Sequence, residues 1–479
     1  MLTRDQAGDI FARIRKHSTA DEVECLFYGG HSALTRFANN TIHQNVAEEN
    51  YGVSVRTVFG GRTARATTNK FDDESLKNVV RASESLARVQ QPDPDLLPVP
   101  DAGGGPIRLR SGQVRATQAG ATQASATQAV PTRHFEATAK LTPGQRAHAV
   151  GQIVSIAQKQ KLTAAGIFSN SEAVEGIFNS RGLSDWHTQT SAEISVTMLA
   201  SDSSGWQKAN FPNVASLDPV SLAKIAATKA VNSAAPREIA PGKYTVILEP
   251  AAVLDTVGFA FFDFGGLAIL DQRSFLNNRV GTKLFGENIT IWDDVGHPLQ
   301  SGSPFDGEGM RRQRVQLVEN GVVKRLVYAR ATAVKMKKSE YADKVGVVEP
   351  TGHGFPIPNE IGEAPMNIVF DSARKPKTVE QMIASTERGI LVTRLWYIRE
   401  VDPYEKILTG MTRDGTFLVE DGKIVCGIRN FRFNQSLIDM LSNVEQMSTP
   451  VRTSGEESFD MVVPAMKVRE FNFTEVTKF

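Results

Sequence analysis

The segment VILEPAAVLDTVGFAFFDFGG, residues 246–266, sets the organisation of the chain because it has the pattern of a strand followed directly by an apolar helix. Its first residues are apolar, and the helix that follows Pro250 would end at a glycine pair, residues 265–266. One acid, Asp255, stands near the middle of this helix, and the segment contains no histidine. The segment therefore raises the question whether this chain carries out chemistry or supports a chain that does.

Composition and charge argue against several classes of protein. The chain has 479 residues, of which 41% are hydrophobic, and this is enough for a sizeable core spread over two or three domains. The formal net charge is +1 and no long basic run occurs. We therefore expect neither a nucleic acid nor a membrane surface as the partner of this chain.

The cysteines and the N-terminus indicate where the protein works. Cys25 and Cys426 lie far apart in sequence, which favours buried thiols in a reducing compartment over a disulfide framework. The N-terminus is too charged for a signal peptide, and no apolar run reaches the roughly 20 residues that span a bilayer. We expect a cytoplasmic protein.

The first 97 residues carry the pattern of a small N-terminal α/β domain. Two amphipathic helices frame this region, one capped by Thr3 and the other capped by Asp72 or Asp73. Three strand-like segments lie between the helices, and the last of them contains a glycine pair typical of a hairpin turn. These strand-like segments are residues 22–29, 33–44 and 51–67.

The remaining sequence divides into a linker and two further domains. Residues 98–135 are rich in proline and glycine and contain a repeated ATQA motif at 116–129, which predicts a flexible linker or insert. Residues 136–238 predict a middle domain with two helices and a strand meander. Residues 239–479 predict a β-rich C-terminal domain. The fold class predicted for the whole chain is α+β.

Turn and cap signals give these two domains their detail. In the middle domain the helices begin near residues 143 and 218, and turns are expected at 169–172, 180–183 and 201–205. In the C-terminal domain, Asn320–Gly321 and Asp421–Gly422 stand between apolar runs, which is a strong hairpin signal. A late helix with Asn434 as its cap is also expected.

Few general catalytic motifs are present. No two of the eight histidines lie within one helical turn of each other, and the sequence contains no nucleophile elbow and no phosphate-binding loop. Polar, glycine-rich segments of the C-terminal domain, one of them around His353, are better candidates because binding residues concentrate in such loops. The candidates for substrate-facing or loop-shaping roles are Asp306, Glu308, Arg394, Arg413 and Asp414. Tight turns held by hydrogen bonds of Asp and Arg remain an equal alternative.

Three stretches of the sequence carry a resemblance to a known family. They are RFANNTIHQ with VSVRTVFGGRTARATTN near the N-terminus, SPFDGEGMRRQRVQLVENGVVKRLVY from residue 303, and TRLWYIREVDPYEKILTGMTRDGTFLVEDGKI from residue 393. Together with NFRFNQSLIDMLSNV they resemble the TldD/PmbA family, whose members are described as metallopeptidases and as modulators of DNA gyrase. The resemblance covers nearly the whole chain apart from the linker.

The resemblance also implies what the opening segment does. One branch of the family carries a His-Glu-x-x-x-His motif and a later cysteine that together hold zinc. The motif's place is taken here by LDTVGF, so that Leu254, Asp255 and Phe259 stand at the histidine, glutamate and histidine positions. The later cysteine would be expected near VRTSGEES, residues 451–458, which has none. The resemblance therefore implies the PmbA/TldE-like branch, with no catalytic residue and no metal ligand in this chain.

The function implied by the resemblance is that of a supporting subunit. The chain would form a heterodimer with a zinc-bearing TldD-like subunit, bind no cofactor itself, and be inactive alone. The complex would be a metallopeptidase that takes up unfolded or flexible peptides. A stand-alone, peptide-binding homodimer without hydrolytic activity is left open by the sequence. A regulator of gyrase that touches DNA is disfavoured by the balanced charge.

Overall fold

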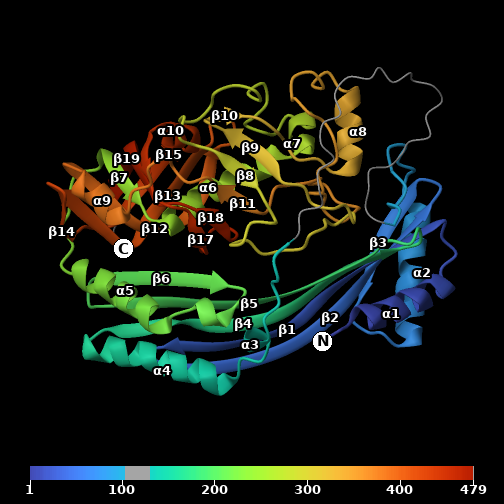
Figure 1. The fold of residues 1–479 in the computed structure, drawn as a ribbon, viewed down its shortest axis with the longest axis horizontal. Helices are drawn as coiled ribbons and strands as arrows, with labels where there is room; N and C mark the ends of the chain where they lie inside the picture. The colour runs from blue at the N-terminus through green and yellow to red at the C-terminus, as the bar shows by residue number, and fades with distance from the viewer. Residues whose placement is uncertain (103–129, 478–479) are drawn as a thin grey trace.

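The computed structural model describes residues 1–102 and 130–477, so the ATQA repeat lies outside the described residues. Figure 1 shows a long, curved sheet as one layer of the molecule, with the C-terminal part of the chain standing over one face of it. Both helices and strands are abundant, and the α+β fold class is confirmed. No helix in the described parts of the chain is long and apolar enough to cross a bilayer.

The long sheet has six antiparallel strands in the order β3-β2-β1-β4-β5-β6. Its strands are β1 (Glu22–Ala38), β2 (Thr41–Phe59), β3 (Arg62–Thr68), β4 (Thr163–Asn179), β5 (Ser184–Leu199) and β6 (Ser204–Phe211). The helices associated with it are α1 (Arg4–His17), α2 (Asp73–Val89), α3 (Glu136–Ala139), α4 (Pro143–Lys159), η1 (Val214–Ser216) and α5 (Pro219–Asn232). Thr3 and Asp72 cap α1 and α2, and both predicted caps are confirmed.

The segments predicted as the N-terminal and middle domains contribute three strands each to this one sheet. The junction is the pairing of β1 with β4 from Glu24 to Phe37, which joins the two segments along most of the length of β1. Each segment keeps its own helices and its own core. One core contains Phe27 beneath α1 and α2, and the other contains Phe37 beneath α4 and α5.

Two predicted chain breaks are wrong. The segments 22–29 and 33–44 are not separate strands, because β1 continues through Gly29 and Gly30 and the chain turns only at Asn39–Asn40, both with positive φ. Residues 169–172, predicted as a turn, lie in the middle of β4. In both cases the strand is paired on two sides, and these pairings hold small and polar residues extended although their local preference is for turns.

The C-terminal part contains two sheets. In the first, the strand order is β12-β7-β19-β15-β13-β14, and an additional pairing of β12 with β13 closes five of its strands into a ring. Its strands are β7 (Gly242–Leu248), β12 (Arg388–Asp402), β13 (Ile407–Glu420), β14 (Lys423–Gly427), β15 (Phe431–Ser436), β16 (Val444–Met447) and β19 (Met466–Val476). The second, smaller sheet contains β8 (Ile291–Asp293), β9 (Val315–Glu319), β10 (Val322–Val323), β11 (Ile368–Phe370), β17 (Val451–Thr453) and β18 (Met461–Val463).

The predicted hairpins at Asn320–Gly321 and Asp421–Gly422 are confirmed as the β9–β10 and β13–β14 turns. The predicted cap Asn434 is wrong, since this residue lies in β15 and Ser436 accepts the capping hydrogen bond instead. The helices of this part are α6 (Pro250–Val257), η2 (Gly258–Phe264), α7 (Gly266–Leu270), α8 (Arg330–Lys338), α9 (Val379–Ala384) and α10 (Leu437–Ser442).

The segment 246–266 forms the centre of the C-terminal core. Strand β7 leads into α6, the chain tightens into the 3₁₀ turn η2, and α7 starts at Gly266. Val246, Leu254 and Phe261 are almost completely buried in one cluster that spans both C-terminal sheets. The predicted strand and apolar helix are therefore confirmed, although the helix changes its winding at Gly258.

The ends of the predicted linker are held in place, which differs from the expected flexibility. Arg330 of α8 donates a hydrogen bond to the carbonyl of Pro98, and Val99 is 1% exposed. On the other side of the undescribed residues, Arg133 is buried and donates to the carbonyls of Gly302, at 2.7 Å, and Val295. Arginine side chains satisfy these backbone carbonyls, and this allows an irregular segment to be buried.

The central position of β1 generates a prediction. A Cβ atom added at Gly30 would lie 1.9 Å from the carbonyl oxygen of Glu172 on β4, so Gly30→Ala must displace backbone between two paired strands. We expect the free energy of unfolding to fall by about 2 kcal/mol. The matched control is Gly151→Ala on α4, where a Cβ meets nothing within 4 Å and alanine favours the helix by up to about 1 kcal/mol. Denaturant unfolding that ranks the two variants equally would contradict this description of β1.

Candidate functional site

The two faces of the six-stranded sheet differ in chemistry. Cys25 and Phe27 of β1 face the helices, and the residues that alternate with them, such as Glu24 and Tyr28, face the C-terminal layer. We call this second face the inner face, and it is largely polar. Its polar residues include Glu24, Tyr28, Ser32, Glu48, Arg56, Arg65, Ser171, Glu175, His187, Gln189, Ser191, Glu193, Lys208 and Asn210.

A cleft of about 670 Å³ lies between the inner face and the loops of the C-terminal layer, and we call it the interlayer cleft. The strands supply Tyr28, Glu175 and Gln189 to its floor. The loops supply the roof, in which Phe305, Phe355, Pro356, Met366 and Phe459 lie among polar residues such as Asp306 and Arg312. Its volume lies in the range of ligand pockets, about 300–1,000 Å³. No local pattern in the sequence marks the residues of the floor, because a single polar residue in an alternating strand usually faces solvent.

Asp306 and Glu308, both predicted site residues, organise the roof loops. Asp306 accepts hydrogen bonds from the backbone N–H groups of Glu308, Met310 and Gly354, at 3.0, 2.8 and 2.7 Å. Glu308 accepts one from the backbone N–H of Arg330, at 2.9 Å. Burial raises the pKa of both carboxyl groups, and for Glu308 the charge of Asp306 adds to this effect. Their contacts are those of loop-shaping residues, and Asp306 also lines the interlayer cleft.

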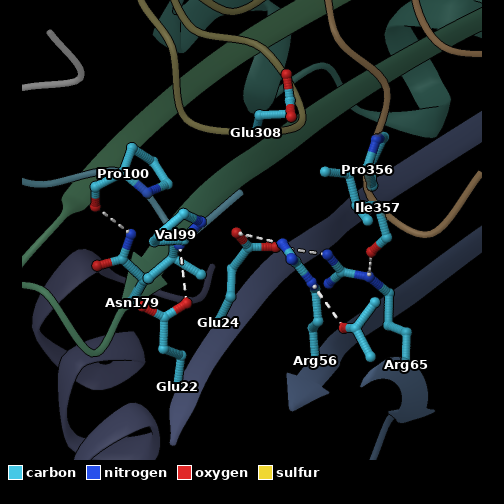
Figure 2. Close-up of polar contacts among 12 residues, drawn as sticks. Glu22, Glu24, Arg56, Arg65, Val99, Pro100, Asn179, Glu308, Pro356 and Ile357 are labelled. Carbon is cyan, nitrogen blue, oxygen red and sulfur yellow. Dashed lines mark hydrogen bonds and ion pairs between the residues drawn. The ribbon is translucent and has the colours of Figure 1, made fainter. Parts of the chain in front are cut away.

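Buried ion pairs on the inner face are linked to the roof by a hydrogen bond (Figure 2). Glu24 lies 2.5 Å from Arg65 and 3.4 Å from Arg56, and it is 1% exposed. Arg65 donates a further hydrogen bond, at 2.8 Å, to the carbonyl of Ile357 in the roof. Figure 2 also shows Glu308 above this group. The sheet and the C-terminal layer are thereby held together at one end of the interlayer cleft.

His353 is a buried histidine that fixes another roof segment. Its Nε2 atom lies 2.9 Å from Asp293, and Arg312 lies 3.3 Å from the other oxygen of the same carboxylate. Burial alone would raise the pKa of Asp293, but His353, Arg312 and the backbone N–H of Asn367 together hold it well below its usual range. Burial lowers the pKa of His353. This group positions the loop, and both ring nitrogens of His353 lie near a polar neighbour, because Thr351 is 2.9 Å from Nδ1.

The other three predicted residues come together at a second place, beside β6. Arg394 donates through Nε to Asp414, at 2.8 Å, and Ser204 donates to the second carboxylate oxygen, at 2.6 Å. The guanidinium of Arg394 lies 4.8 Å from the ring centroid of Trp206, while Arg413 is half-exposed at the rim. The five predicted residues therefore form two clusters, one at the roof of the interlayer cleft and one where β13 meets β6.

The cluster at β6 generates a prediction that separates a structural from a substrate-facing role. Asp414→Asn leaves the buried guanidinium of Arg394 without its counter-charge, and loss of one partner of a buried pair costs about 3–5 kcal/mol. Asparagine also tolerates the positive φ of this residue. The control Arg413→Ala removes a half-exposed charge and should cost no more than about 1 kcal/mol. Equal, small losses in denaturant unfolding would show that Asp414 is not held for structure.

The segments in which the resemblance places a zinc site are packed together. Leu254 and Asp255 of α6 are fully buried, and Phe259 lies in η2 at the partly buried edge of the same core. The segment 451–458 lies directly against them. A Cβ atom at Gly455 would lie 2.3 Å from Oδ1 of Asp255 and 2.5 Å from Leu254.

These residues do not fit a zinc ion. Leucine, phenylalanine and glycine side chains offer no ligand atoms. The Oδ1 atom of Asp255 already accepts hydrogen bonds from the backbone N–H groups of Glu456 and Glu457, both at 3.2 Å. Within residues 1–102 and 130–477 no group of three or more His, Cys, Asp or Glu side chains is arranged to hold a metal. The place is thus filled by packing and by a carboxyl group that anchors a loop.

The buried carboxyl of Asp255 generates a pH prediction. Burial raises its pKa to about 7, although the two backbone hydrogen bonds act in the opposite direction. In the unfolded chain it ionises near pH 4, so between about pH 4 and pH 7 only the folded state keeps the proton. Its contribution to stability is present below about pH 4 and is lost as the pH rises to 7.

Asp255→Asn removes this titration and keeps an oxygen acceptor for the loop. As the pH rises through this window, the wild type should therefore lose stability relative to the variant by up to about 1.4 kcal/mol per pH unit. The measurement is denaturant unfolding of both proteins at intervals from pH 4 to pH 8. Parallel curves for the two proteins would contradict a raised pKa for Asp255.

Comparison with known proteins now places the chain. Residues 241–475, which include α6, match the model of the PmbA/TldA metallopeptidase C-terminal domain, so this is a metallopeptidase-related protein. Residues 23–87 match the model of PmbA/TldA metallopeptidase domain 1. The two models cover more than half of the chain, which belongs to the TldD/PmbA family.

Individual relatives are more distant. A metalloprotease of Methanothermobacter thermautotrophicus is 24% identical over 59% of this chain and 61% of its own length. The metalloprotease PmbA of Escherichia coli O157:H7 is 22% identical over 64% of each chain. This chain thus spans less than two thirds of the length of either relative. The crystal structure of TldE from Thermococcus kodakarensis superposes with a TM-score of 0.80 at 18% identity, covering 98% of this chain and 100% of that chain, so the fold is shared.

Proposed function

We propose that this chain is the non-catalytic subunit of a TldD-type zinc metallopeptidase complex that acts on unfolded or flexible peptides. The observation that carries the proposal is the combination of family membership with a packed motif position. Leu254, Asp255 and Gly455 fill the place with apolar contacts and backbone hydrogen bonds. A metallopeptidase needs an ion with an open coordination position, and these residues leave none.

In this proposal the zinc and its chemistry belong to a TldD-like partner, and this chain contributes shape and binding surface. Support comes from the interlayer cleft, which is open to a ligand and has several apolar side chains in its roof above a polar floor. Further support comes from β2. Among the described residues β3 pairs only with Val53–Phe59, so Thr41–Gly52 has β1 alone as its neighbour. Such an edge can accept an extended peptide through backbone pairing.

The alternative is a stand-alone peptide-binding homodimer without hydrolytic activity. The interlayer cleft and the free edge of β2 favour it as well, because both belong to this chain and need no catalytic partner. The two functions differ in one observable, which is whether cleavage appears when a zinc-bearing family member is added.

The test is peptidase activity and zinc content of the purified chain, of a His-Glu-x-x-x-His family member from the same organism, and of their mixture. We expect no cleavage of an unfolded peptide by this chain alone, and cleavage in the mixture with about one zinc per heterodimer. Chelation should abolish the activity, and added zinc should restore it. Activity and stoichiometric zinc in this chain alone would overturn the proposal, and a mixture no more active than the partner by itself would favour the homodimer.

A further inference from the structure

The floor of the interlayer cleft holds a carboxylate without a counter-ion. Glu175 lies in the C-terminal half of β4, opposite Tyr28 on β1 and His187 on β5. Its side chain is exposed to the cleft, and no hydrogen bond or ion pair to it is found among the residues that the structure describes. Protein surrounds its other sides, and the resulting desolvation raises its pKa, which Arg312 offsets in part.

Apart from Glu175, the charged side chains that line the cleft already have hydrogen-bond or ion-pair partners. Arg312, the basic side chain that lines the cleft, is paired with Asp293. Asp306 accepts three backbone N–H groups, and Asp460 is paired with Arg452 at 2.9 Å. Glu175 is therefore the carboxylate of the lining that a ligand can neutralise.

A second unsatisfied acceptor lies in the wall of the cleft. Asn367 is 4% exposed, and its amide nitrogen donates to the carbonyl of Ser301 at 2.6 Å. Its Oδ1 atom is buried and has no hydrogen-bond partner among the described residues. Gln189 uses its side-chain oxygen to accept the N–H of Gly302. Because the Oδ1 atom of Asn367 is buried, the acceptor that the cleft exposes to a ligand is Glu175, which favours a ligand that donates hydrogen bonds and carries positive charge.

Apolar side chains of the roof favour a ligand that also has an apolar part. Phe305, Phe355, Met366 and Phe459 line the side of the cleft that faces Glu175 across the gap between the layers. A cation at the end of an aliphatic stem matches this arrangement, because the stem packs against apolar atoms while its charged end reaches a carboxylate. Lysine has this form, with four methylene groups and an ammonium that donates three hydrogen bonds.

We propose that the interlayer cleft binds a lysine side chain of an extended peptide, with Glu175 as the counter-ion. The peptide nature of the ligand rests on the proposed function, and the preference for a cation rests on the cleft itself. The inference gives the complex a preference among unfolded segments, namely for those that carry a basic residue flanked by apolar ones.

The test measures binding to this chain alone, by fluorescence anisotropy of labelled peptides that differ at one central residue. The central residue is lysine, norleucine, which has the same stem without the charge, or glutamate. We expect the lysine peptide to bind about tenfold more tightly than the norleucine peptide, as a charge-assisted hydrogen bond allows, and the glutamate peptide to bind most weakly. Equal affinities for lysine and norleucine would overturn the inference.

Three variants test whether the preference belongs to the cleft. Glu175→Gln should remove the difference between lysine and norleucine. The control Glu74→Gln takes the same charge from the exposed first turn of α2, outside both the cleft and the free edge of β2, and should retain the difference. A preference that survives in Glu175→Gln would overturn the inference. Glu175→Asp, which keeps the charge but retracts it by one methylene, provides a second test. It should weaken the preference several-fold, and an unchanged preference would count against Glu175.

Competition with 1,5-diaminopentane tests whether the cleft recognises a lysine side chain within a peptide or a free amine. If the diamine binds to the wild type through Glu175 and no peptide does, amine recognition holds and the peptide source is overturned. Because these measurements need neither zinc nor a partner, failure of the mixture to cleave would remove the proposed function without affecting them. Loss of the lysine preference would in turn leave the subunit role standing.

Discussion

The burial of one polar sheet face beneath a second layer is the constraint on which the rest of this structure depends. Side chains alternate along β1, so the same strand that supplies Phe27 to a core must present Glu24 to the C-terminal layer. A buried carboxylate without a partner costs several kcal/mol. The contacts of Glu24 with Arg56 and Arg65, and that of Arg65 with the backbone of Ile357, meet this requirement. The interlayer cleft is the region where the two layers do not close in this way.

The same constraint explains the roles of the predicted site residues. Asp306 and Glu308 turn the roof loops back on themselves and bind their backbone N–H groups. Asp414 joins the ring of the C-terminal layer to Ser204 of the long sheet, while Arg394 neutralises it. Acidic and basic residues near glycines were recognisable in the sequence as loop-shaping. Their division into two clusters depends on sheet topology, which no local pattern contains.

Sequence motifs predicted several helix caps and hairpin turns correctly, because the hydrogen bonds that form them join residues close together in the chain. Caps such as Thr3 and hairpin turns such as Asp421–Gly422 satisfy backbone groups within a few residues, and both are readable from the sequence. The continuity of β1 through Gly30 depends on pairing with strands on both sides, one of them more than a hundred residues away, and was missed. Glu175 was missed for a related reason. Its significance lies in the lack of a direct ion-pair partner among the described residues of either layer, and that depends on how the two layers pack.

The packed motif position is the strongest link between structure and function. Leu254 occupies space in the core, Gly455 allows the following loop to approach within van der Waals distance, and Asp255 binds that loop through its backbone. The side chains of Leu254, Phe259 and Gly455 thus offer no ligand atoms at this place in the fold. In the function that we propose, the chemistry belongs to another chain.

The most direct measurement is thermal unfolding of the purified chain in excess zinc and in excess chelator. A site that binds zinc in the folded state alone would raise the unfolding temperature in proportion to the logarithm of the zinc concentration. We predict identical unfolding curves in the two solutions, because Leu254, Asp255 and Gly455 leave no coordination position. A zinc-dependent stabilisation that disappears in Asp255→Asn would contradict the central claim.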